Sequence, residues 1–167
     1  MIGRAQRKRT TMKAKDGVLE RLNKVLRAEL TAVHQYLLHA SMCKNWGYGR
    51  LHEHFSHLAQ EEVSHSAGLM DHILYLNGTP DVQKVDDVAA GKTVADLFEA
   101  DLAFETEDMQ ALQECVANCA KVGDFTTRHL LEHMLIDTEE HIDWFETQLR
   151  TIEQVGAENY LSEQITK

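Results

Sequence analysis

The chain has 167 residues, of which 43% are hydrophobic and 26% charged, and its formal net charge is −10. This length suits one domain with a sizeable core, and no apolar run approaches the roughly 18 residues that a membrane span requires. The first ten residues hold four of the cations, so the rest of the chain has a formal charge of −14, which argues against nucleic acid as a partner.

The basic start, MIGRAQRKRT, is predicted to be a disordered arm. It contains no apolar stretch of the kind found in a secretory signal, and it is short for a transit peptide. Met12 begins MKAKDGVLERLN, which reads like a natural start, so residues 1–11 are either an extension or the product of an upstream start codon. The folded domain is expected to span residues 12–167.

Four long helices are predicted, because the single proline, Pro80, leaves most of the chain free to be helical. In the first helix, apolar residues recur three and four apart, the pattern of an amphipathic helix. NWGYG, NGTP and KVGD are turn signals that separate the helical patterns. The predicted helices span residues 18–44, 51–76, 94–120 and 125–152, with a short fifth helix within 159–165.

The links between these helices predict how they pack. The short links at 45–49 and 121–124 force antiparallel hairpins, whereas residues 77–93 form a long connection with little helical pattern. A helix of twenty-six residues is about 39 Å long, and seventeen extended residues reach about 56 Å. The long connection can therefore cross the whole bundle, which makes helices two and three parallel. This predicts an all-α, ferritin-like four-helix bundle with one long crossover.

Acids and histidines recur beside strongly apolar neighbours on all four helices. EEVSH in the second helix places Glu62 and His65 at i and i+3, about 60° apart around a helix, where they can hold one metal ion together. Taken alone this pair is weak, because a solvated polar face has the same spacing. Glu29, Glu105 and His141 occupy comparable positions on the other helices. Buried acids are seldom tolerated unless paired or metal-bound, so together they predict a centre for iron or manganese.

Over residues 12 to about 164 the sequence resembles bacterioferritins, through LNKVLRAEL, HQYLLHA, NWGYGRLHEH, ADLFEADLAFE and HIDWFETQL. The resemblance implies a cage of twenty-four subunits that oxidises Fe²⁺ at a buried di-iron centre and stores ferric mineral inside, with haem at a two-fold interface. It also implies the ligands of the centre: Glu29 and His65 on one iron, Glu105 and His141 on the other, and Glu62 as a bridge.

Two positions depart from the bacterioferritin pattern. The second bridging glutamate falls on Thr138, which leaves three carboxylates against the four positive charges of two Fe²⁺ ions, so the second iron is expected to bind more weakly. Asp137 and Glu139 lie about 100° to either side of Thr138, and neither enters the gap without a distortion such as a π-bulge. The haem-binding methionine is replaced by Val63, which has no donor atom. Haem b is therefore doubtful, and His34 is an alternative ligand.

Three further residues are candidates through the same resemblance. His57 and Glu61 match inner-surface positions that pass iron between the centre and the cavity, although a solvated acidic face has the same pattern. Tyr36 matches a tyrosine that supplies an electron during oxidation, and a buried tyrosine bonded to a carboxylate is the alternative. Other histidines, including His39, have no carboxylate arrangement that singles them out and are expected at the surface or an interface.

The sequence thus predicts a cytoplasmic iron-storage subunit that oxidises Fe²⁺ with oxygen or peroxide. Three cysteines, an odd number, fit a reducing compartment, and Cys115 and Cys119 lie one helical turn apart, where cysteine usually acts as a small buried hydrophobe. Two alternatives stay open. One is a largely non-catalytic subunit of a mixed cage whose partner has the intact centre and the haem methionine. The other is a free-standing di-metal oxygenase or peroxidase that forms no cage.

Overall fold

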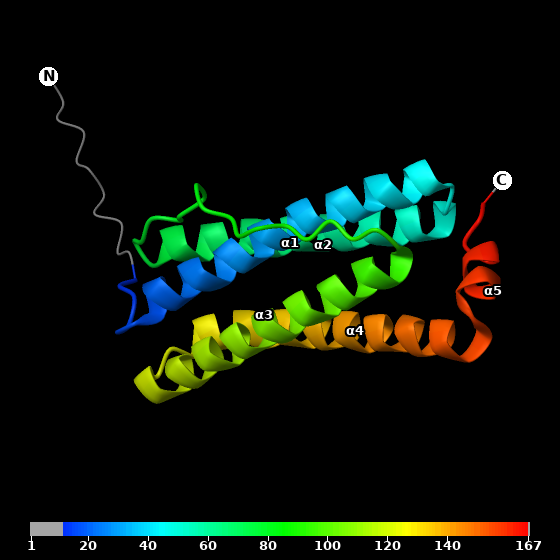
Figure 1. Cartoon of the computed structure of the whole chain (residues 1–167). Helices are drawn as coiled ribbons and strands as arrows, with labels where there is room; N and C mark the ends of the chain where they lie inside the picture. Colours follow the sequence, from blue (N-terminus) through cyan, green and yellow to red (C-terminus); the bar gives the residue numbers. More distant parts are fainter. Residues whose placement is uncertain (1–11, 167) are drawn as a thin grey trace, which may run out of the picture.

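The computed structural model describes residues 12–166, which form a bundle of four long helices closed at one end by a short fifth helix (Figure 1). Each predicted long helix is confirmed, with ends that differ by three residues at most. The predicted basic arm, residues 1–11, lies outside the described part of the chain. The helices are α1 (Val18–Trp46), α2 (Gly49–Tyr75), α3 (Val94–Val122), α4 (Phe125–Val155) and α5 (Ala157–Ser162).

The two short links are built from residues that end one helix and start the next. Gly47 (φ 88°) and Gly123 (φ 71°) take the left-handed conformation that follows many helix C-termini and that other residues adopt only with strain. The carboxylate of Asp124 then caps the first turn of α4 by accepting a backbone N–H. These links make α1 antiparallel to α2 and α3 antiparallel to α4, as predicted.

The crossover, residues 76–93, runs along the side of α1 (Figure 1). Its contacts advance in the same direction on both segments, so the crossover is parallel to α1, and α3 returns antiparallel to it. Helices α2 and α3 are therefore parallel, which confirms the predicted topology. Three side chains of α1 accept amide hydrogens from the crossover: Asn23 from Asp81 at 2.7 Å, Thr31 from Asp86 at 2.9 Å and Gln35 from Ala89 at 3.1 Å.

The prediction for His39 is wrong, because this residue is fully buried. Its Nδ1 lies 2.8 Å from Asp101 Oδ2, and its Nε2 lies 2.7 Å from the Ala89 carbonyl oxygen. Gln35 donates to the other oxygen of Asp101 at 2.7 Å. This buried network joins α1, α3 and the crossover, and it gives both oxygens of the Asp101 carboxylate a hydrogen-bond partner.

Two apolar clusters fill the bundle, one on either side of a polar layer. Phe55 and Phe98 belong to the cluster nearer α5, whereas Leu69 and Leu112 belong to the other. Each long helix passes from one cluster to the other, so its middle turns lie between them. The buried acid or histidine at this transition is Glu29 on α1, Glu62 on α2, Glu105 on α3 and His141 on α4.

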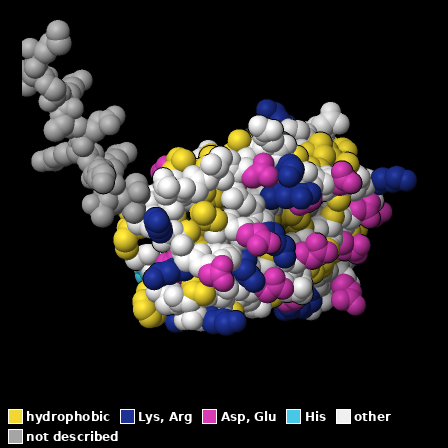
Figure 2. Space-filling model, turned by 90° about the vertical axis from the view of Figure 1, so that its left-hand side faces the viewer, with side chains coloured by type: hydrophobic (Ala, Val, Ile, Leu, Met, Phe, Trp, Pro, Cys, Tyr) yellow, Lys and Arg dark blue, Asp and Glu magenta, His cyan; other side chains and the backbone are white. Residues whose placement is uncertain are grey.

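Within residues 12–166, no helix is both long and apolar enough to cross a membrane. Figure 2 shows the molecule from one side, where acidic and basic side chains are interspersed with apolar ones. No extended patch of a single charge covers that face.

Candidate metal centre

Five side chains singled out in the sequence converge between the two apolar clusters. They form two groups of three that share one glutamate, and within each group one ligand atom per residue lies within 4.8 Å of the others. All four long helices contribute, because the fold brings their middle turns to the same level. The first group is Glu29, Glu62 and His65, and the second is Glu62, Glu105 and His141.

In the first group, His65 is held from both sides of its ring. Nδ1 lies 2.8 Å from Glu62 Oε2 and 3.4 Å from Glu29 Oε2, whereas Nε2 lies 3.0 Å from Asp137 Oδ2. A carboxylate behind a histidine fixes the orientation of the ring and makes the other nitrogen a better metal ligand. Burial opposes protonation of this ring, but the contacts with Glu62 and Asp137 outweigh it and raise the pKa of His65 to about 9.

In the second group, His141 Nδ1 lies 3.4 Å from an oxygen of Glu62 and 3.4 Å from an oxygen of Glu105. This nitrogen is buried and has no hydrogen-bond partner. Burial opposes protonation, but Glu105 and Glu62 raise the pKa of His141 to about 9. Glu105 also accepts a hydrogen bond from the hydroxyl of Tyr36. An unpartnered nitrogen between two carboxylate oxygens is an arrangement that a cation would complete, so the residues fit a metal ion.

The three glutamates differ in how readily they ionise. Burial, reinforced by the charge of Glu62, raises the pKa of Glu29 well above its usual range, and burial also raises the pKa of Glu105. Burial acts the same way on Glu62, but hydrogen bonds with Glu29 and His65 outweigh it and lower its pKa. Glu62 is therefore the most acidic of the three. Full ionisation of all three needs added positive charge, and oxygen ligands with one imidazole per group suit iron or manganese.

Thr138 is the position where the resemblance to bacterioferritins implies a second bridging glutamate. Thr138 is buried, and its hydroxyl donates to the Met134 carbonyl oxygen at 3.0 Å, one turn back on α4. Helix α4 is uninterrupted from Phe125 to Val155, so the π-bulge considered as a way to bring in Asp137 does not occur. Asp137 instead contacts His65, a role that the sequence did not reveal because it depends on how α2 and α4 pack.

His57 and Glu61 lie beside the centre rather than in it. His57 is exposed, and its Nδ1 lies 3.2 Å from Glu61 Oε2. The same oxygen lies 3.5 Å from His141 Nε2. These contacts form a continuous row of nitrogen and oxygen atoms that could bind a metal ion, from the surface of α2 to the second group.

The two residues connected with haem face away from this centre. Val63 is 44% exposed, and His34 is exposed as well. One ring nitrogen of His34, Nδ1, lies 2.7 Å from the Leu30 carbonyl oxygen. Neither side chain approaches the buried glutamates, so a haem held at these positions would lie at the surface of α1 and α2.

A further carboxylate near the centre, Asp108, was not predicted. It lies one turn beyond Glu105 on α3, is only 6% exposed, and its Oδ1 has no hydrogen-bond partner. Burial and the charges of Glu105 and Glu62 raise the pKa of Asp108 well above its usual range. The sequence indicates Asp108 as a candidate ligand only through its i, i+3 spacing from Glu105, which is the spacing of Glu62 and His65.

Comparisons with known proteins agree with this geometry. A sequence model of the ferritin-like domain matches residues 19–155. The bacterial ferritin of Synechocystis sp. is 41% identical over 156 residues, which cover 93% of this chain and 100% of that protein. The bacterial ferritin of Pseudomonas aeruginosa is 42% identical over 149 residues, 89% of this chain and 96% of that protein. A bacterioferritin of Mycolicibacterium paratuberculosis is 39% identical over 150 residues, 90% and 94% of the two chains. With this bundle and similarity over nearly its whole length, the chain belongs to the ferritin family and, within it, to the bacterioferritins.

Proposed function

We propose that this chain is an iron-storage subunit that assembles into a hollow cage, takes up Fe²⁺ and holds it as ferric mineral. The observation that supports this most is the layer between the apolar clusters, which consists of three buried glutamates, the buried His141 and the partly buried His65. Such a layer is costly in a low-dielectric interior unless cations balance it. The names of the relatives, bacterioferritin and bacterial ferritin, support iron as the cation.

Fe²⁺ is then the substrate of the centre, and oxygen or peroxide is the oxidant. Glu29 and His65 hold one metal position, Glu105 and His141 hold the other, and Glu62 lies between the two groups as the bridge. The positions are unequal, because α4 has Thr138 where a second bridging carboxylate is expected. We therefore expect the second metal to bind more weakly and oxidation to be slower than at a complete centre.

Residues around the centre have supporting roles in this proposal. His57 and Glu61 pass iron between the inner surface and the second group, along the row of contacts described above. Tyr36, hydrogen-bonded to Glu105, supplies an electron during oxidation. The formal charge of −14 beyond the first ten residues favours the accumulation of cations by the cage. The free cysteines, all buried, are compatible with the cytoplasmic location that we propose.

Size-exclusion chromatography combined with aerobic iron loading tests the proposal. The purified protein should elute as a large assembly, oxidise Fe²⁺ in a saturable reaction and retain the iron during a second elution. Glu62→Ala should reduce the rate to that of buffer, whereas Glu53→Gln, an exposed acid on the same helix, should not change it. A monomer or dimer that oxidises Fe²⁺ would favour the free-standing di-metal enzyme instead.

A mixed cage is the second candidate function, favoured by Thr138 and Val63 together. In that case the chain is a largely non-catalytic subunit whose partner has the intact centre and the haem methionine. The protein alone would then form cages but oxidise iron no faster than buffer. Activity and a strong haem absorption would be gained only on co-assembly with the partner subunit.

A further inference from the structure

We propose that Asp108 supplies the carboxylate that α4 lacks at Thr138, so that the second metal position is completed from α3. This role of Asp108 rests on the proposed function, because it concerns the same centre. It adds a ligand that the bacterioferritin pattern does not assign and that the sequence did not single out.

Asp108 and Thr138 lie at the same level of the antiparallel pair α3 and α4. Glu105 and His141 fix the register, since their ligand atoms are 3.4 Å apart. Three residues forward on α3 leads to Asp108, and three residues back on α4 leads to Thr138. Each step covers the same rise of about 4.5 Å. The extra carboxylate on α3 is therefore level with the missing carboxylate on α4.

One carboxylate oxygen of Asp108 is free to accept a ligand. Its Oδ1 is buried without a hydrogen-bond partner, which is uncommon for a buried polar atom. The charges that act on it belong to members of the centre: Glu105, Glu62, His65 and His141.

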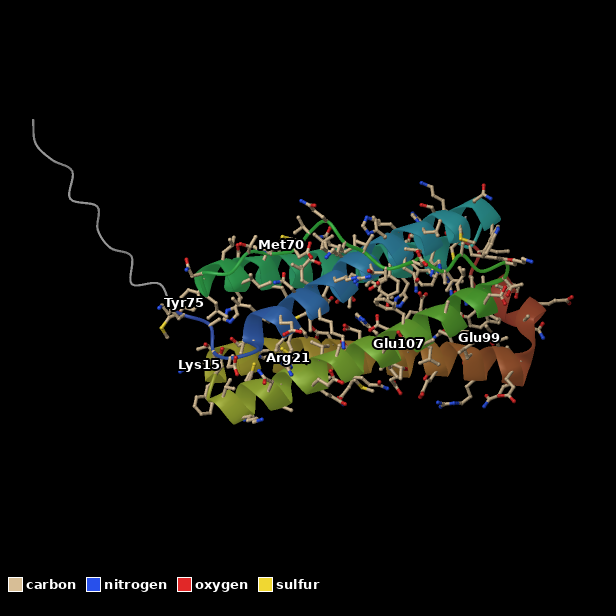
Figure 3. The ribbon with its side chains drawn as sticks, turned by 60° about the vertical axis from the view of Figure 1, so that its left-hand side comes forward. Lys15, Arg21, Met70, Tyr75, Glu99 and Glu107 are labelled. Carbon is tan, nitrogen blue, oxygen red and sulfur yellow. The ribbon has the colours of Figure 1, made fainter. Side chains whose placement is uncertain are left out.

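Two other acids on α3, Asp101 and Glu107, lie in different environments. The buried Asp101 has both oxygens bonded, to Gln35 and His39, and so has no capacity left for a ligand of this kind. Glu107, labelled in Figure 3 and adjacent to Asp108 in the sequence, is exposed to water. Asp108 is thus the acid of α3 that is buried beside the centre with an oxygen still free.

Asp108 lies outside both three-residue groups in this structure, so its role as a ligand requires a change of side-chain rotamer. Without cations, like charges favour keeping its carboxylate apart from Glu62 and Glu105. Two divalent cations reverse this preference, since Glu29, Glu62, Glu105 and Asp108 then give four negative charges against four positive ones.

An anaerobic titration of the intact oligomer with Co²⁺ tests this role, followed by visible absorption and by calorimetry. The unmodified protein should bind two Co²⁺ per subunit with unequal affinity. Asp108→Asn should leave the tighter site unchanged and weaken the second by at least about tenfold, the lower end of the effect of supporting residues at metal sites. Glu107→Gln, the exposed neighbour, is the matched control and should leave both sites unchanged.

A double-mutant cycle with Thr138→Glu gives an independent readout. If Asp108 fills the gap, Thr138→Glu should strengthen the second site strongly when combined with Asp108→Asn, and only slightly when Asp108 is present. Equal gains in both backgrounds would show that the two positions are independent and would overturn the inference.

The thermal midpoint of the metal-free protein separates a loss of ligand from a loss of fold. Asp108→Asn should keep or raise this midpoint, because it removes a charge from a buried acidic layer, while reducing the increase that Co²⁺ brings. Wild-type affinity at both sites of Asp108→Asn would exclude Asp108 as a ligand and leave the proposed function intact. If Co²⁺ binding is the same in the unmodified protein and in Glu62→Ala, the proposed function fails too.

Discussion

Glu29 and His65 on α1 and α2 face Glu105 and His141 on α3 and α4 across the shared Glu62, yet the two halves are supported differently. Behind His65 stands Asp137, 3.0 Å from Nε2. Behind His141 stands the half-buried Glu61, at 3.5 Å from Nε2. The first half therefore has a histidine fixed by a close carboxylate, whereas the second has a looser one.

Part of the difference comes from two adjacent residues of α4 that make different contacts. Asp137 and Thr138 are neighbours on α4, but they point about 100° apart around the helix axis. Asp137 thus reaches His65 on α2, whereas the hydroxyl of Thr138 donates to the Met134 carbonyl oxygen of its own helix. A substitution of Asp137 is therefore expected to affect the metal position that holds His65 and to leave the other unchanged.

The largest effect is expected from Glu62→Ala, which removes the residue that both halves share. Binding of both metals should weaken by more than about 100-fold, beyond the range for residues that only support a ligand. Calorimetric titration with Co²⁺ measures this directly, with Glu53→Gln as the exposed control on the same helix. Retention of one tight site in Glu62→Ala would contradict the shared position of this residue.

Asp137→Asn should break the support of the first half alone. The substitution keeps the shape of the side chain but removes the charge beside His65 Nε2, so the tighter site should weaken by about 10- to 100-fold. The second site should keep its affinity, which the same titration measures. The exposed Glu139→Gln, two residues along α4, is the matched control. Equal losses at both sites would mean that the halves are not supported separately.

Metal affinity should depend on pH in both halves. The pKa values of His65 and His141 are about 9 in the metal-free protein, raised from the usual 6.5. A metal binds the neutral ring, so each histidine must release its proton when a metal binds below pH 9. Each site should weaken by up to about tenfold for each pH unit below 9. Proton release in buffers of different ionisation enthalpy checks this, and binding without proton release would contradict it.

The same shifts set the pH dependence of folding stability without metal. A histidine whose pKa is raised on folding contributes stability that is fully present below its unfolded value, near 6.5, and is lost as the pH rises through about 9. The thermal midpoint of the metal-free protein should therefore fall between pH 6.5 and 9. A midpoint that rises over this window would contradict the charge pairing in the centre.

The smallest effect is expected from Tyr36→Phe, which touches the second half through Glu105. Both metals should still bind, and initial oxidation should slow by roughly fivefold, the scale of one lost hydrogen bond. Freeze-quenched samples examined by electron paramagnetic resonance test the electron-donor role, since a tyrosyl radical should form in the unmodified protein and not in Tyr36→Phe. The same radical in both proteins would exclude Tyr36 as its source.

The fold followed from features that the sequence displays locally. Turn residues such as Gly47 and Gly123 marked the helix ends, and the length of the segment predicted at residues 77–93 indicated the crossover. The residues of the two metal groups were predicted because each acid or histidine stands among apolar neighbours at a helical spacing.

Contacts between distant segments account for what the sequence did not reveal. His39 is buried because Asp101, 62 residues away, and the crossover satisfy both of its ring nitrogens. Asp137 supports a histidine on another helix, and Asp108 is buried by the packing of α3 against its neighbours. Helical periodicity gives the face of one helix but not the side chain that lies opposite it, so these roles required the structure.

We propose that the glutamates and histidines that meet at the middle of the four helices form one centre with two unequal metal positions. Anaerobic calorimetric titration of the intact oligomer with Fe²⁺ tests it most directly. We expect two binding events per subunit, with the second weaker than the first and both lost in Glu62→Ala. Two events of equal affinity, or binding that persists unchanged in Glu62→Ala, would contradict it.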